Sequence, residues 1–182
     1  MSTSSDPATF KMVSPAIIPL GLGLLATSSM FFGNIGLSLC GPLPIISEQI
    51  GASGLTTSQR IRVWRLFFDR ATTFIVGGVA SNTILNLSVP FLTESQAVRN
   101  LALISAASTA LVLPYTVAFI ANTNKALIQL DDRKVDVLSE GEQKRAVELI
   151  AKWDKLHRVR YIFYGSAWAS GLAAVVGSFA GI

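Results

Sequence analysis

Residues 153–182 read WDKLHRVRYIFYGSAWASGLAAVVGSFAGI, and this stretch decides the fold class. Its last 22 residues, 161–182, contain no charged side chain. A transmembrane helix needs about 20 consecutive, mostly apolar residues, so this segment is long enough to cross a bilayer. The eight residues before it carry five ionisable side chains. An apolar segment that follows such a charged stretch indicates a helix entering a membrane from an aqueous loop.

Three further segments have comparable length and hydropathy, at residues 16–39, 66–92 and 98–121. Of the 182 residues, 51% are hydrophobic and only 14% are charged, whereas a soluble domain carries about a quarter charged residues. The sequence therefore predicts one all-α domain over residues 15–182, an integral membrane four-helix bundle whose last span is 161–182. Residues 1–14 are expected to form a disordered tail, because they begin with a Ser- and Thr-rich stretch.

The basic residues predict how the chain sits in the membrane. The loops at 40–65 and 123–160, with the adjoining ends of the spans, hold 13 of the 15 Lys and Arg side chains, and Lys11 and Arg99 are the other two. Basic loops stay in the cytosol, so we expect both charged loops there and both termini on the opposite side. A cleavable signal peptide is not expected, because no compact basic region precedes the first apolar segment.

Composition excludes several classes of site. One cysteine, Cys40, and one histidine, His157, rule out a disulfide framework, a zinc finger, an iron–sulfur site and a two-histidine iron centre. The basic residues alternate with acids and lack interleaved aromatics, which argues against nucleic-acid binding. Acidic residues of the second charged loop are expected to be solvated rather than to bind a metal: Asp131, Asp132, Asp136, Glu140 and Glu142. A haem held axially by His157 is left open.

The segment from Glu142 into the last span reads as an amphipathic helix that continues into the membrane. At about 100° per residue, four side chains share its buried face: Trp153, His157, Arg160 and Tyr164. Lys155 and Arg158 point away from that face. The shared face predicts either a functional site or an interfacial cap in which His157 and Arg160 bind lipid phosphate or loop carbonyls.

Other polar residues at span ends admit two interpretations. After Pro114, which kinks the third span, Tyr115 and Asn122 fall on nearly the same face, and the direction of Asn124 depends on where the helix ends. These amides could close a binding pocket or act as helix caps and interhelical contacts. Trp64 is expected to be an interfacial anchor or part of a pocket wall.

Two further pairs lie one helical turn apart and are expected to make structural contacts. Arg65 and Asp69 can form an ion pair at the start of the second span. Asn82 and Asn86 share a face deeper in that span, where amide side chains hydrogen-bond between helices.

Three local patterns resemble the anthrone oxygenase-like membrane proteins: residues 64–68, residues 114–116 followed by Asn124 and Leu127, and above all residues 153–160. The resemblance extends over roughly residues 15–180. It implies four transmembrane helices and the oxidation of an anthrone to an anthraquinone by molecular oxygen. It also implies a role in fungal polyketide biosynthesis, for which an uncleaved chain would reside in the endoplasmic reticulum.

The resemblance further implies a mechanism and a set of site residues. The chain has no flavin or nicotinamide motif, so the oxygenase is expected to be cofactor-independent, with oxygen as co-substrate. Such an enzyme needs a base, a donor to the substrate oxyanion and a dry aromatic slot. His157 is the candidate base, since an unperturbed imidazole has a pKa of about 6.5. The oxyanion donors would be Arg160 and Asn124, and the substrate-binding residues Trp153, Tyr115, Trp64, Asn122 and Tyr164.

Three alternatives to this oxygenase are carried forward. One is another tailoring enzyme acting on a polyketide or terpenoid. The next is a non-catalytic scaffold that holds biosynthetic enzymes at the bilayer through the charged helix from Gly141 to Lys155. The last is a transporter, which is disfavoured because four spans are few and no ionisable residues lie deep in them. Expected partners are the lipid bilayer, a small aromatic substrate and either biosynthetic enzymes or a second copy of the chain.

Overall fold

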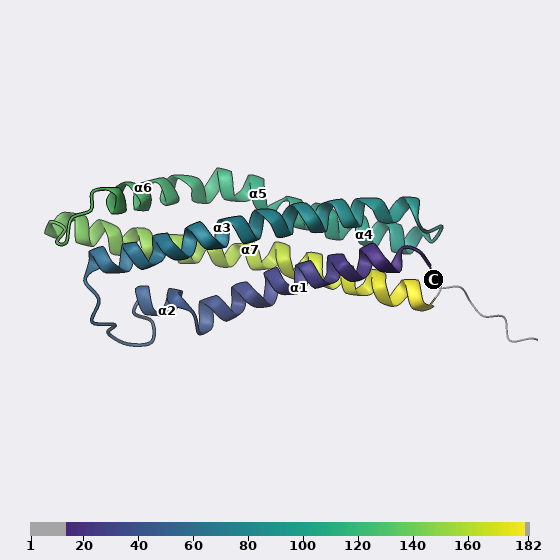
Figure 1. Ribbon diagram of the computed structural model, residues 1–182, viewed down its shortest axis with the longest axis horizontal. Coiled ribbons are helices and arrows are strands. Elements are labelled where there is room, and N and C mark those ends of the chain that lie inside the picture. The colour runs from purple at the N-terminus through teal and green to yellow at the C-terminus, as the bar shows by residue number, and fades with distance from the viewer. Residues whose placement is uncertain (1–13, 181–182) are drawn as a thin grey trace, which may run out of the picture.

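The computed structural model describes residues 14–180, and within this range the chain is helical without β-strands. Four long helical segments run alternately in opposite directions and form an antiparallel bundle (Figure 1). The predicted all-α four-helix bundle is therefore confirmed. Of the predicted disordered tail, residues 1–13 lie outside the described residues.

The first two segments contain α1 (Ile17–Leu39), the short α2 (Pro42–Ile46), α3 (Thr57–Ser88) and the 3-10 turn η1 (Val89–Phe91). The third segment is built from α4 (Gln96–Ala110), α5 (Val112–Tyr115), the π-helical turn η2 (Thr116–Ile120) and α6 (Ala121–Asp132). The fourth is the single helix α7 (Glu140–Ala180).

The four segments are long and apolar enough to cross a membrane, and this supports an integral membrane protein. Large apolar side chains also cover the outside of the bundle, among them Phe74, Ile84 and Ile162, which are 56%, 68% and 68% exposed. An apolar exterior of this kind marks a surface that meets lipid or a partner. The first predicted span coincides with α1, whereas the other three are shorter than their helical segments, because the helices continue past the apolar residues as charged, amphipathic turns.

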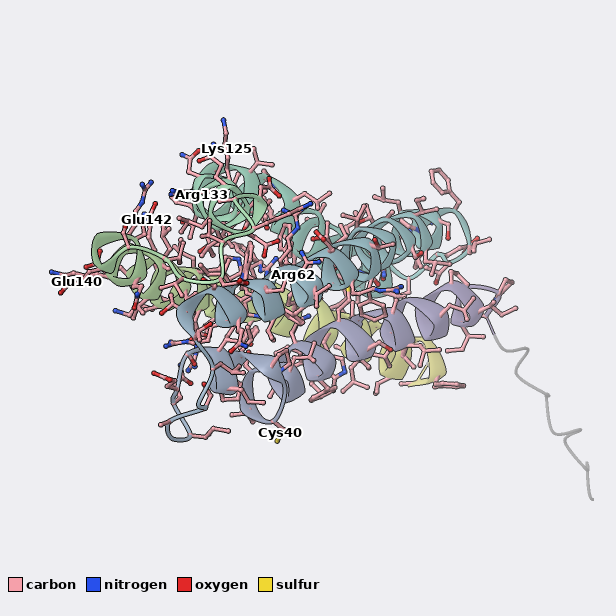
Figure 2. The ribbon with its side chains drawn as sticks, turned by 60° about the vertical axis from the view of Figure 1, so that its left-hand side comes forward. Cys40, Arg62, Lys125, Arg133, Glu140 and Glu142 are labelled. Atoms are coloured by element: carbon pink, nitrogen blue, oxygen red, sulfur yellow. The ribbon has the colours of Figure 1, made fainter. Side chains whose placement is uncertain are left out.

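The extended helix ends gather at one end of the bundle, which we name the charged end: α2, the start of α3, α6 and the start of α7. Figure 2 shows Arg62, Arg133, Glu140 and Glu142 at this end. Ion pairs join its elements, with Arg62 Nη1 2.9 Å from Asp131 Oδ2 and Arg133 paired with Glu142. These pairs account for two of the acidic residues that we expected to be solvated.

Local sequence explains where α3 begins. The Thr56 hydroxyl accepts a hydrogen bond from the Gln59 backbone N–H at 3.3 Å, and the Gln59 side chain accepts one from the Thr56 N–H at 2.9 Å. This reciprocal capping box satisfies two backbone donors that the first turn of a helix leaves unpaired. As a result α3 starts at Thr57, a full two turns before the predicted span at 66.

Small residues bring α1 close to α3. A Cβ at Gly23 would lie 2.7 Å from Asn86 Nδ2 and 3.0 Å from Asn82 Oδ1, and one at Gly78 would lie 2.7 Å from Met30 Sδ. In lipid, helices associate through such close contacts and through interhelical hydrogen bonds. The Asn82 amide donates to Thr109 Oγ1 at 2.7 Å, which joins α3 to α4 and confirms the expected structural role of this amide.

Candidate functional site

The predicted face of α7 is buried in the bundle. Trp153, His157, Arg160 and Tyr164 are 2%, 1%, 9% and 0% exposed. Lys155 and Arg158 are exposed on the other side of the helix, as expected. Asp154 is also buried, which the helical projection did not predict, and its carboxylate accepts hydrogen bonds from Gln49 at 3.1 Å and from Arg158 at 2.9 Å.

His157 and Arg160 form a hydrogen-bonded pair at the centre of this face. Arg160 Nη2 contacts His157 Nδ1, and because a guanidinium can only donate, Nδ1 must be the accepting nitrogen. The imidazole is then neutral and carries its proton on Nε2. Its ring stacks on Trp153, with ring centroids 4.7 Å apart and planes 13° from parallel, so both its position and its tautomer are set by neighbours.

Arg160 is a buried cation without a counter-ion in the described part of the chain. The carboxylates that form ion pairs among residues 14–180 pair with other basic residues. In the same range, Arg160 Nε, His157 Nε2 and the Tyr164 hydroxyl are buried and have no hydrogen-bond partner. Burial of an uncompensated charge costs several kcal/mol, so this arrangement favours a ligand that carries negative charge.

Asn124 reaches the same site from the third segment. Its Oδ1 accepts a hydrogen bond from Trp153 Nε1 at 2.8 Å, which leaves the Nδ2 donor as the group that Asn124 can offer to a ligand. The π-helical turn η2 determines this direction. A π turn holds one residue more than an α turn, so positions after Ile120 are rotated by about 100° relative to a regular helix. Asn124 therefore faces the core, and Asn122, expected on the face of Tyr115, is exposed.

A cavity of about 100 Å³ lies between α3, the α5–η2 segment and α7. Asn124, Trp153, His157 and Arg160 line it, so four of the predicted site residues share one space. The rest of its wall is mostly apolar: Asn34, Phe67, Phe68, Ala71, Thr72, Ile75, Val76, Val112, Leu113, Thr116 and Ile120. The site is thus a small apolar chamber with a polar wall on α7 and α6.

The other predicted substrate-binding residues lie outside the cavity lining. Trp64 is fully buried behind it, 6.0 Å from Trp153 between ring centroids and stacked on Phe68 at 5.0 Å, so it does not anchor the chain at the interface. The Tyr115 hydroxyl donates to the Leu156 carbonyl at 3.1 Å. Tyr164 belongs to a core cluster with Met30.

Sequence reasoning missed the contribution of α1. Asn34 is 4% exposed and lines the cavity, and its backbone carbonyl accepts a hydrogen bond from the Tyr161 hydroxyl at 3.1 Å. The same hydroxyl contacts Ser38 Oγ. A signal existed, since an amide inside an otherwise apolar span is costly and marks a contact or a site.

The charged end offers no cluster of metal ligands in residues 14–180: no three His, Cys, Asp or Glu side chains there gather closely enough to hold a metal ion. The expected pair of Arg65 and Asp69 is present, with Arg65 Nε 2.9 Å from Asp69 Oδ2. Its Coulomb energy is small because both side chains are partly exposed.

Fold and site together define a class of protein: an integral membrane four-helix bundle with an aromatic-lined cavity beside a buried arginine that has no carboxylate partner among residues 14–180. The model of the anthrone oxygenase family matches residues 64–170, which is more than half of the chain. The protein belongs to the anthrone oxygenase family, as the sequence resemblance implied. Comparison with curated proteins and with solved structures finds no match. The matched range contains Asn124, Trp153, His157 and Arg160 but not α1.

Proposed function

We propose that this protein is a membrane-bound oxygenase that converts an anthrone-like aromatic polyketide to a quinone. Family membership supports an oxygenase or polyketide-tailoring role. The observation that carries the proposal is the buried Arg160 guanidinium, which lines an apolar cavity and has no carboxylate partner in the described chain. The oxyanion formed from an anthrone supplies the missing negative charge.

The reaction needs oxygen as its only other reactant. A base removes a methylene proton from the anthrone, and the charge moves to the carbonyl oxygen. The resulting aromatic oxyanion passes one electron to oxygen, and the radical pair combines into a carbon-bound peroxide that takes up a proton. Loss of the second methylene proton breaks the O–O bond and releases water, so one anthrone and one oxygen molecule give one anthraquinone and one water. We propose that no cofactor takes part.

Different side chains that line the cavity remove the methylene proton and stabilise the oxyanion in the first step. Arg160 and the Nδ2 donor of Asn124 stabilise the developing oxyanion by hydrogen bonding to it. His157 is the base. Its lone pair is bound by Arg160 in this structure, so the substrate oxygen must draw the guanidinium away before Nδ1 accepts the proton. Arg160 thereby couples oxyanion formation to proton removal.

The first step can be tested without oxygen. Under anaerobic conditions in heavy water, the wild-type protein in detergent should exchange the methylene protons of an anthrone faster than protein-free micelles do. His157→Gln, which keeps an acceptor for Arg160, should lose this acceleration. Equal exchange by wild type and His157→Gln would remove His157 from the role of base. Admission of oxygen should then give quinone at a rate above spontaneous oxidation.

A scaffold function rests on a different observation, the exposed charged face of α7 at Lys152, Lys155 and Arg158. In that case replacements on this face would abolish pathway function, while His157 would be dispensable. We further propose that the charged end lies in the cytosol and both termini on the opposite side, in the endoplasmic reticulum membrane, and that the enzyme serves secondary-metabolite biosynthesis.

A further inference from the structure

A second space adjoins the catalytic cavity. It is a groove of about 330 Å³ between α1 and α3, and its lining includes Gly33, Leu37, Arg70 and Phe74. Leu37 and Phe74 are exposed on the outside of the bundle. In a membrane this groove therefore faces the lipid, the phase in which an apolar aromatic compound dissolves.

The groove and the cavity share part of their walls. Asn34, Phe67, Ala71 and Ile75 line both. Three of these residues are spaced four apart on α3 and form one ridge, with the cavity on one side and the groove on the other. Ala71 has the smallest side chain of that ridge, so the wall between the cavity and the groove is thinnest there.

The size of the cavity indicates that the site continues beyond it. An apolar cavity of about 150 Å³ holds a single benzene ring, whereas an anthrone has three fused rings. The catalytic cavity measures about 100 Å³. Pockets for ligands of this size measure about 300–1,000 Å³. The catalytic cavity is smaller than this range, whereas the adjoining groove, at about 330 Å³, lies within it.

The groove also carries one charge. Arg70 is the charged residue in its described lining, whose other members are apolar or neutral. A guanidinium at the edge of an apolar groove matches a planar aromatic body with an anionic group, because its donors bind a carboxylate or phenolate in two places. A lipid phosphate has the same chemistry, but continuity with the catalytic cavity favours the substrate.

We propose that the groove between α1 and α3 is the outer half of the substrate site, through which an acidic, planar aromatic compound enters from the bilayer past Ala71, with Arg70 bound to its anionic group. This inference rests on the proposed function for the identity of the substrate. It adds α1, which lies outside the matched family range, to the residues that determine specificity.

Gly33 provides a test that should leave the fold intact. A Cβ at Gly33 would meet no atom within 4 Å, and the same holds for Gly21, which is on the same helix and outside the groove lining. Binding of a hydroxyanthraquinone carboxylate, a compound that cannot be oxidised further at the reacting carbon, is followed by quenching of tryptophan fluorescence. Gly33→Leu should weaken binding at least tenfold, while Gly21→Leu should bind as wild type does.

Arg70→Gln separates the charge from the groove. It should weaken binding of the carboxylate about tenfold and leave binding of neutral anthraquinone unchanged. Bilayer nanodiscs with and without an anionic phospholipid distinguish the two sources of anion. If the anionic lipid competes with the carboxylate in wild type but not in Arg70→Gln, the groove is a lipid site and the proposal is overturned.

Binding and turnover fail independently in this design. Wild-type affinity in both Gly33→Leu and Ala71→Leu would refute the outer subsite, whether or not the protein oxidises anthrones. Binding that Gly33→Leu weakens, in a protein that produces no quinone, would support the subsite and reject the oxygenase. Absence of any binding by wild type would refute the outer subsite, and quinone formation by the same protein decides the oxygenase separately.

Discussion

The two halves of the bundle bury polar side chains for different purposes. In the half away from the charged end, Asn82 donates to Thr109 at 2.7 Å, Asn86 donates to Asn82 Oδ1 at 2.8 Å, and Ser105 donates to the Ala167 carbonyl at 2.9 Å. Each of these bonds joins helices or turns. In the half near the charged end, Arg160 and His157 contact each other and a cavity.

The polar groups of the two halves differ in charge and in whether a cavity lies beside them. Neutral amides and hydroxyls can satisfy one another inside lipid, and such bonds contribute about 1 kcal/mol each. A guanidinium without a carboxylate is not satisfied in this way. A buried cation beside a cavity is therefore better evidence for a ligand than a buried amide in a packed interface.

The largest expected effect is loss of catalysis when a cavity residue near the charged end is replaced. His157→Gln and Arg160→Gln should lower the rate of anthrone oxidation by roughly 10²–10⁴-fold, because one removes a base and the other the main oxyanion donor. Oxygen uptake measures the rate, and thermal unfolding in detergent checks that both variants remain folded. Rates within threefold of wild type would place the chemistry elsewhere.

In the half of the bundle away from the charged end, a substitution should mainly change the stability of the fold. Gly23→Ala should destabilise the protein by roughly 1–3 kcal/mol, since the new Cβ would lie 2.7 Å from an Asn86 side chain that is held by hydrogen bonds. Gly21→Ala is the matched control, because its Cβ meets open space. The two variants are compared by unfolding temperature in one detergent. Equal unfolding temperatures would show that α1 and α3 are not packed this closely.

The same substitution, Trp to Phe, can be made at a tryptophan that lines the cavity and at one outside it. Trp153→Phe keeps an aromatic ring beside His157 but loses the 2.8 Å bond to Asn124, so turnover should fall about tenfold. Trp168→Phe loses a 3.1 Å bond to Ser28 Oγ, which lies outside the cavity, and should leave turnover unchanged. The opposite order of effects would contradict the assignment of Asn124.

The smallest effect is expected on the exposed face of α7. Lys152→Ser and Lys155→Ser should change the turnover rate by less than about twofold. The equilibrium constant for unfolding should also change by less than about twofold, as isolated surface substitutions do. The measurement is the oxidation rate in cells that also carry the partner enzymes of the pathway. Loss of product in those cells, with normal turnover by the purified variants, would favour the scaffold.

Much of the fold followed from hydropathy. The helix face that buries Trp153, His157, Arg160 and Tyr164 was predictable because a regular helix repeats every 3.6 residues. The direction of Asn124 was not, since it depends on the π turn at residues 116–120, which helical periodicity does not predict. Trp64 was misplaced for a related reason: its position at a span end suggested an anchor, but the capping box at Thr56 extends α3 and places Trp64 inside the bundle.

The cavity itself could not be predicted from any single segment. It needs Asn34 from α1, Phe67 and Ala71 from α3, and His157 and Arg160 from α7, so it exists only once the helices are packed. Sequence indicated candidate site residues, and tertiary packing determined which of them meet.

The most direct test of the account is the stoichiometry of oxygen use by the purified protein with a polyketide-derived anthrone. The account predicts quinone formation above the rate in protein-free micelles, with one oxygen molecule consumed per quinone, one atom of labelled oxygen in the new carbonyl, and loss of the acceleration in His157→Gln. Quinone formation at the micelle rate for several anthrones would contradict the oxygenase function.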